Sequence, residues 1–233
     1  MVEALKNLSR KQPDQPLWAQ IMGEVRYLRG GWEYEEALSR MQQAVALGAT
    51  NRVPYVVGAE AARRLGRRNV ALDLLRRGLD QHPNDVAMLN NLVYTLAGSD
   101  EGVAEALQKL PGLLRRAESD NLHVLDTAAT VYTRAGELDR ATGLIAVLLE
   151  RAPGGSPTAV RARLKLAEVD LLRGRAQQAA ETLEVLLKEA AGADDNQRRQ
   201  ARHMLQTARE RLREDRTSDS PDLRIREDAA PAP

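Results

Sequence analysis

The chain has 233 residues, of which 43% are hydrophobic, so it can bury a core. Its formal net charge of only +1 excludes a general electrostatic attraction to nucleic acid or to a membrane surface. Aromatic residues make up only 3%, and Phe and Cys are absent, which favours close-packed helices of Leu, Ala and Val over a sheet and excludes disulfides and thiolate sites. Because no apolar run approaches about 18 residues and the start lacks the apolar stretch of a signal peptide, we expect no membrane insertion and a cytoplasmic location.

The first stretch, residues 1–16, is predicted to be half of a helical unit or an N-terminal helix. The segment "VEALKNLSRKQPD" has the character of the second helix of a pair, and no first helix precedes it. Either it frays as a terminal cap, or it continues a longer array of which this chain is a part. In both cases a bare apolar end invites docking by another chain.

Residues 17–192 repeat one spacing. In "YTRAGELDRATGLIAVLLERAP", Gly136 is followed five residues later by Ala141 and twelve further on by Pro153. The stretch "LGRRNVALDLLRRGLDQHP" repeats both intervals. A series of alanines lies 34, 35, 35 and 38 residues apart, namely Ala37, Ala71, Ala106, Ala141 and Ala179. A period of about 34 residues predicts an array of helical repeats, and the loop "PGGSP" lengthens the last interval.

The pattern resembles the tetratricopeptide repeat, which carries Trp-x2-Leu-Gly-x2-Tyr in its first helix, Ala-x3-Phe in its second and then Pro. An aliphatic residue replaces the Phe in every copy, giving the pairs Ala37/Met41, Ala71/Leu75, Ala106/Leu110, Ala141/Ile145 and Ala179/Leu183. The first-helix position is taken by Trp18, Tyr55, Leu89, Leu125 and Arg163. The resemblance implies an all-α fold, a right-handed α-solenoid of about five antiparallel helix pairs with a C-terminal capping helix.

Each repeated residue type has a physical role. A small Ala lets the second helix lie close to the first, Gly in the turn tolerates a left-handed φ, and Pro ends the second helix. The third copy departs from this pattern because Pro111 lies five residues past Ala106. We expect Pro111 to kink or split this helix, at a cost of about 3 kcal/mol, into "GVAEALQKL" and "GLLRRAES".

The C-terminal part divides into two segments. Residues 193–213 place Ala201, Leu205, Ala208 and Leu212 on one helical face, which predicts a helix that caps the last repeat. Residues 214–233 are charged and rich in Pro and Ala, and we expect them to be disordered.

No combination of residues indicates catalysis, a cofactor or a metal. His82, His123 and His203 have no partner at metal-ligand spacing, and no Gly-rich phosphate loop is present. We therefore expect no enzyme activity.

A cluster of arginines lies on both sides of one predicted helix–helix turn. Its members are Arg63, Arg64, Arg67, Arg68, Arg76 and Arg77. We favour a solvent-exposed turn here over a binding site for a phosphate group or an acidic peptide segment.

The resemblance implies that the first helices line a concave groove that binds a peptide or a partner protein. It assigns to this groove Glu60, Arg63, Asn90, Asn91, Tyr94, Asp126, Thr130, Arg134, Arg161 and Lys165. Asn side chains can hold an extended peptide backbone because they both donate and accept hydrogen bonds. The carboxylate clamp of some relatives is rejected, since Glu60 would repel a carboxylate and Thr127 stands where Asn is expected.

Two functions remain open at this point. The first is a protein-interaction scaffold with a peptide or protein ligand in its groove. The second is a structural or self-associating segment of a larger assembly, joined through the N-terminal end of the array. A mass that depends on protein concentration would favour the second.

Overall fold

The computed structural model describes residues 14–189 and 192–218, with side chains up to residue 215. All regular secondary structure in these ranges is helical. Most of the predicted N-terminal half-repeat (1–13) and the tail from 219 onward lie outside the described residues. The helices are α2 (Pro16–Arg29), η1 (Gly31–Glu33), α3 (Tyr34–Ala46), α4 (Val53–Arg64), α5 (Arg68–Gln81), α6 (Val86–Ala97), α7 (Asp100–Arg116), α8 (Leu122–Arg134), α9 (Leu138–Arg151), α10 (Pro157–Leu172), α11 (Ala176–Glu189) and α12 (Asp195–Ser218).

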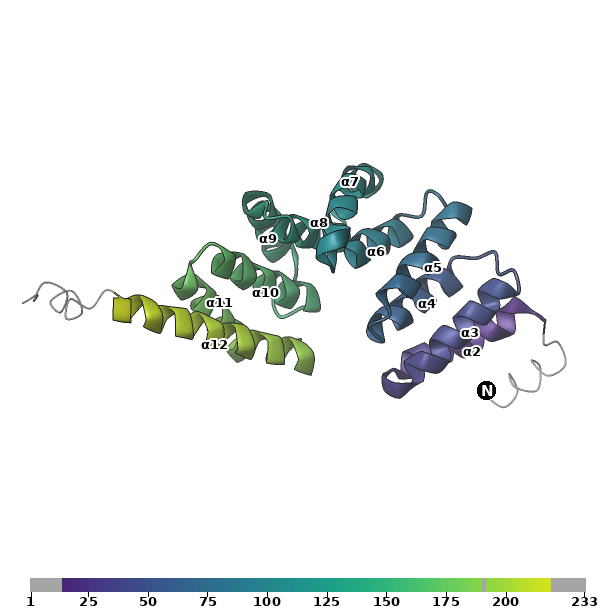
Figure 1. Cartoon of the computed structure of the whole chain (residues 1–233), viewed down its shortest axis with the longest axis horizontal. Coiled ribbons are helices and arrows are strands. Elements are labelled where there is room, and N and C mark those ends of the chain that lie inside the picture. The colour runs from purple at the N-terminus through teal and green to yellow at the C-terminus, as the bar shows by residue number, and fades with distance from the viewer. Residues whose placement is uncertain (1–13, 190–191, 219–233) are drawn as a thin grey trace, which may run out of the picture. The chain divides into compact units, whose positions relative to one another are not determined.

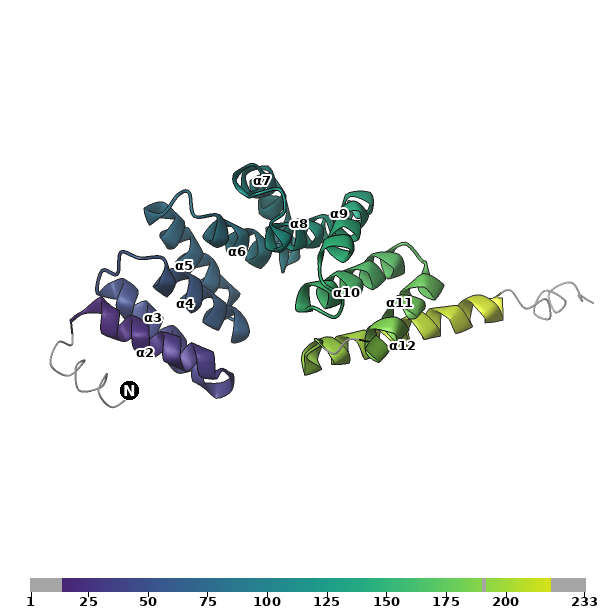
Figure 2. The ribbon, with the colours of Figure 1, turned by 180° about the vertical axis from the view of Figure 1, so that it is seen from behind.

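The helices form two compact units, Met1–Thr127 and Ala128–Pro233, and α8 crosses the boundary between them. In unit 1, α2 packs on α3, α4 on α5 and α6 on α7, and each pair contacts the next through α3–α4 and α5–α6 (Figure 1). In unit 2, α10 packs between α9 and α11, and α12 lies against α10 and α11 (Figure 2). The predicted all-α fold of successive helix pairs is confirmed in the described residues.

The repeated alanines of the second helices are fully buried. Each of the five, and each aliphatic residue four positions later, exposes at most 1% of its surface. A methyl group is the smallest side chain that still fills this space, so the backbones of the two helices of a pair approach closely. The predicted packing role of the Ala-x3-aliphatic pairs is therefore confirmed.

The turn glycines adopt the left-handed conformation that the spacing predicts. Gly66, Gly136 and Gly174 have φ of 72°, 75° and 72°. At the first of these turns the amide of Arg67 donates to the carbonyl of Ala62 at 2.8 Å, and the other two turns repeat this bond. The third copy differs, because Gly98 has φ of −75°. Its second helix, α7, instead has Gly102 in its first turn, close against the backbone of Leu96 in α6.

The prediction that Pro111 splits its helix is wrong. A single helix, α7, runs from Asp100 to Arg116 through Pro111. Ala106, Leu110 and Leu113 are buried on one continuous face of this helix, which packs on α6, while Pro111 itself is exposed. Burial on both sides of the proline keeps the helix continuous although one backbone hydrogen bond is missing.

The boundary predicted at Arg213 is also corrected. The terminal helix, α12, continues to Ser218. Ala201, Leu205 and Ala208 are buried against the last helix pair, as the pattern indicates. Residues 214–218 are polar and contain neither Gly nor Pro. Polarity ends the burial of side chains, but it does not interrupt the backbone hydrogen bonds of a helix.

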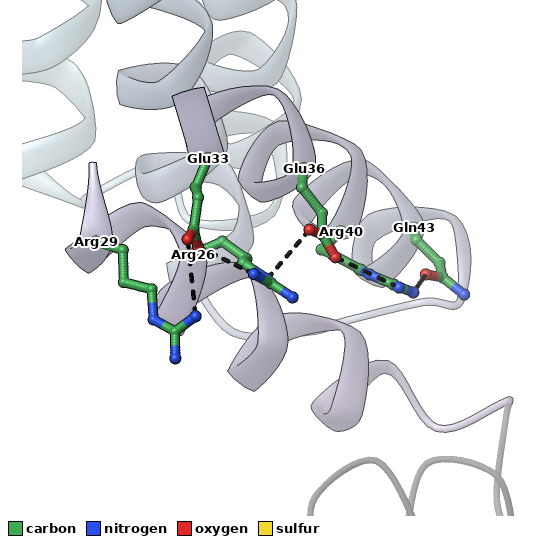
Figure 3. Close-up of polar contacts among 6 residues, drawn as sticks. All are labelled: Arg26, Arg29, Glu33, Glu36, Arg40 and Gln43. Carbon is green, nitrogen blue, oxygen red and sulfur yellow. Dashed lines mark hydrogen bonds and ion pairs between the residues drawn. The ribbon is translucent and has the colours of Figure 1, made fainter. Parts of the chain in front are cut away.

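Ion pairs join the first helix pair, as Figure 3 shows. Arg26 of α2 pairs through Nη1 with Glu33 and through Nε with Glu36 of α3, both at 3.1 Å. Arg29 reaches the other oxygen of Glu33 at 3.7 Å. Arg40 pairs with Glu36 at 3.7 Å and continues the chain along α3. Because Glu33 is buried, these contacts offset the cost of removing its charge from water and fix α2 against α3.

Candidate functional site

A hollow of about 640 Å³ opens in unit 1 where α4, α6 and α8 begin. Four asparagines and one His, Arg and Asp give it a polar wall, and three small apolar side chains complete it. The lining residues are Arg52, Asn84, Asp85, Val86, Ala87, Asn90, Asn91, Asn121, His123 and Val124. Two predicted groove residues, Asn90 and Asn91, therefore share one concave surface.

Capping side chains shape the rim of this hollow. Asn51 accepts from the amide of Val53 at 3.0 Å, Asp85 from Met88 at 2.8 Å, and Asn121 from two amides of α8 at 3.1 and 3.2 Å. These bonds satisfy amides that would otherwise attract an anion.

The charges at the rim are largely compensated. Arg52 pairs with Asp85 at 3.2 Å, and Asp85 also caps α6. The hollow thus presents mainly amide groups and no concentrated charge. Such a surface suits a neutral polar ligand better than a phosphate or a free carboxylate.

Asn90 carries an acceptor without a partner. Its Oδ1 is buried and makes no hydrogen bond within the chain. A buried acceptor left unpaired costs about 1–3 kcal/mol, so a turn of the Asn90 side chain that brings this oxygen to a ligand donor in the hollow would be favourable. The neighbouring Asn91 is half-buried, and its backbone carbonyl accepts from the Thr95 hydroxyl at 2.7 Å. That bond involves only the backbone of Asn91, and the residue lines the hollow.

A second polar cluster lies one helical turn further along α6. Glu60 of α4 accepts two hydrogen bonds from Arg63, at 2.5 and 2.7 Å, and one from Arg64 at 3.0 Å. The guanidinium of Arg63 also lies over the ring of Tyr94, 5.6 Å from its centroid. Two guanidinium groups and one carboxylate leave this cluster with a net charge of +1. Three predicted groove residues are brought together here, namely Glu60, Arg63 and Tyr94.

Ionisation of this cluster is fixed by its internal bonds. Burial alone would raise the pKa of Glu60, but hydrogen bonds and charges of Arg63 and Arg64 outweigh it and lower the pKa. The hydrogen bonds that Arg63 donates to Glu60 in turn raise the pKa of Arg63. Burial and then the Glu60 charge raise the pKa of Tyr27 on α2, which extends the cluster to a third helix. The carboxylate of Glu60 is therefore held by two arginines of its own helix.

The remaining predicted groove residues have different surroundings. Asp126 is only 7% exposed, so it belongs to the interior of the fold more than to its surface. Thr130 is half-buried and Arg134 exposed, and both lie in the part of α8 that belongs to unit 2. Arg161 of α10 donates to the Thr158 hydroxyl at 3.2 Å. Lys165, one turn further along α10, is half-buried.

The arginines of the second-copy turn contact groups of the chain itself. Arg67 pairs with Glu35 and Arg76 with Glu105, both at 2.8 Å, and Arg77 with Asp73 at 3.7 Å. Arg68 donates to the Gly98 carbonyl. These bonds favour the solvated-turn interpretation over a phosphate site.

Metal ligands and membrane-spanning helices are two other features on which a function could rest. In the described part of the chain, no three His, Asp or Glu side chains converge in a way that could hold a metal ion. None of the helices described has the apolar length that a bilayer crossing requires.

Comparison with known proteins identifies the fold. No family model matches the sequence, and no curated protein is similar to it. Among solved structures, TTC0263, a thermophilic tetratricopeptide protein of Thermus thermophilus, matches with TM-score 0.65 and 20% identity over 82% of this chain and 98% of its own. The chain has the tetratricopeptide-repeat fold. YrrB, a tetratricopeptide protein with an unusual peptide-binding site, matches with TM-score 0.58 and 16% identity over 81% and 93% of the two chains.

Yeast Tom70 also matches, with TM-score 0.60 and 16% identity over 97% of this chain. The chain spans only 46% of the length of Tom70. At such identities the likeness concerns the fold alone.

Sequence reasoning missed part of the candidate site. It did not include Arg52, Asn84, Asp85 or Asn121, which line the hollow. A signal was present, because capping residues precede successive first helices at intervals close to the repeat period, namely Asn51, Asp85, Asn121 and Ser156.

Proposed function

We propose that this tetratricopeptide-fold protein is an interaction scaffold without catalytic activity, and that the hollow of unit 1 binds an extended peptide. The observation that carries this proposal is the buried, unpartnered Oδ1 of Asn90 in a wall of asparagines. A peptide backbone alternates N–H donors and C=O acceptors. It can therefore donate to this oxygen while its carbonyls accept from neighbouring side-chain amides.

The chemistry of the wall favours a peptide over an anion. The helix starts are capped and Arg52 is paired with Asp85, so little positive charge remains for a phosphate. The apolar groups of Val86, Ala87 and Val124 offer contacts for small side chains of the ligand. The peptide-binding site of YrrB, a protein of the same fold, is consistent with this role.

The second cluster suggests which kind of residue the peptide carries beyond the hollow. Tyr94 comes one turn after Asn91 on α6, and Arg63 lies over its ring. Because Glu60, Arg63 and Arg64 together carry +1, this end of the surface accepts an acidic ligand side chain. We therefore expect the bound peptide to combine small residues in the hollow with an acidic residue beside Tyr94.

A peptide selection tests the proposal. The full chain is used to select binders from a random peptide library, and affinities are measured by fluorescence polarisation. In the test variant, Asn84→Ala is combined with Asn91→Ala. The control combines Asn69→Ala with Asn196→Ala, which removes two exposed amides on α5 and α12.

We expect the test variant to bind the selected peptides at least about tenfold more weakly, since two hydrogen bonds of about 1 kcal/mol each are lost. The control should bind like the wild type. Both variants should keep the helical circular dichroism of the wild type. Equal affinities of test and control variants would contradict binding in the hollow.

A further inference from the structure

The first described helix, α2, carries an apolar stripe on the side that faces away from its partner. Leu17 and Leu28 are 48% and 82% exposed. Ile21 and Val25 are half-buried and fall on the same stripe at helical spacing. The opposite side is occupied, because Gly23 lies against Met41 of α3. Arg26, on that occupied side, pairs with Glu33 and Glu36 (Figure 3).

The position equivalent to Leu17 is buried in each of the other first helices. Aligning Trp18 with the first-helix residues of the later copies places Leu17 level with Pro54, Met88, Val124 and Ala162. All four are buried, and the last three expose at most 2% of their surface. In unit 1 the second helix of one pair packs on the first helix of the next, as α3 does on α4 and α5 on α6. The α2 stripe therefore has the position and the chemistry of a surface that receives a preceding second helix.

Residues 1–13 have the sequence of such a helix. Met1, Leu5, Leu8 and Pro13 repeat the spacing of Ala141, Ile145, Leu148 and Pro153. In the later copy the first three of these residues are fully buried. We infer that residues 1–13 pack as a second helix on the Leu17–Leu28 stripe and close the N-terminal end of the array within the same chain.

The length and attachment of this segment fit the stripe. At about 1.5 Å per residue, a helix of this segment reaches roughly 20 Å, and the stripe from Leu17 to Leu28 extends roughly 16 Å. Only Asp14 and Gln15 separate the segment from Pro16, where α2 begins, and connections this short join antiparallel helices. Because the segment is tethered at the stripe, its effective concentration there exceeds that of any second copy.

A single cysteine can report on this contact, since the chain contains none of its own. Leu17→Cys is introduced into the full chain, and the rate of its reaction with a soluble thiol reagent is measured. The same measurement is made after adding Leu5→Asp with Leu8→Asp. A matched control adds Asn7→Asp with Ser9→Asp, which brings the same two charges to the polar side of the segment. Val185→Cys, exposed on α11, serves as an internal standard.

We expect Leu5→Asp with Leu8→Asp to accelerate labelling of the cysteine at position 17 at least about tenfold, because two buried leucines are lost from the contact. The control should leave the rate unchanged, and Val185→Cys should react alike in all backgrounds. Equal rates at position 17 in all three backgrounds would overturn the inference. So would protection that rises with protein concentration together with a doubled mass, because a second copy would then cover the stripe.

Discussion

Gly102 offers a sharp test of how the third helix pair is packed. It lies buried in the first turn of α7, directly against the backbone of Leu96 in α6. A Cβ at this position would overlap the carbonyl oxygen of Leu96 and lie 2.9 Å from its carbonyl carbon. Backbone atoms cannot rotate out of the way, so α6 and α7 would have to separate. Overpacking of this kind costs about 1–3 kcal/mol and gains back at most about 1 kcal/mol of helix propensity.

We therefore expect Gly102→Ala to lower the free energy of unfolding by about 2 kcal/mol and the melting temperature by about 4–8 °C. The matched control is Gly143→Ala in α9, where nothing lies within 4 Å of the added Cβ. At position 143 only the higher helix propensity of Ala acts, so Gly143→Ala should raise the free energy of unfolding by about 0.5–1 kcal/mol. Urea unfolding followed by circular dichroism measures both. If both substitutions stabilise the protein to the same extent, the close approach of α6 and α7 is refuted.

Three further outcomes are expected from single contacts. Pro111→Ala restores a backbone donor to Leu107 and should stabilise the protein by about 1–2 kcal/mol in urea unfolding. Glu60→Gln should be less stable than the wild type at neutral pH. Because the folded pKa of Glu60 is lowered, its contribution is lost as pH falls through that value, so the difference should shrink as the pH falls below 4.5 in acid titrations. Ser156→Ala removes the bond to Ala159 and should lower the melting temperature by about 2–4 °C.

The repeat itself could be predicted because its residues act locally. The small second-helix position, the turn glycine and the terminal Pro each follow from the conformation or size of one residue. Even so, Pro111 shows the limit of this reasoning. The sequence predicts a local cost for Pro111, because proline cannot donate a backbone hydrogen bond. Burial of Leu110 and Leu113 on either side of Pro111 nevertheless keeps α7 continuous.

The candidate site was predicted only in part. Asn90, Asn91 and Tyr94 were found because they occupy one face of a first helix. Arg52 and Asn121 were missed because they belong to different helix starts, about 35 residues to either side of this helix, and only packing brings these starts together.

By itself, the sequence determined the helical class, the repeat period and the residues that close each pair, because these depend on backbone preferences and on side-chain volume within one repeat. Only the tertiary structure decided which polar groups remain unsatisfied. The orphaned oxygen of Asn90 depends on how neighbouring helices pack around it, and so does the position of Arg63 of α4 over the ring of Tyr94 in α6. Hydrogen bonds and charges are satisfied or left open by atoms within a few ångströms, and the packing of the helices sets those distances.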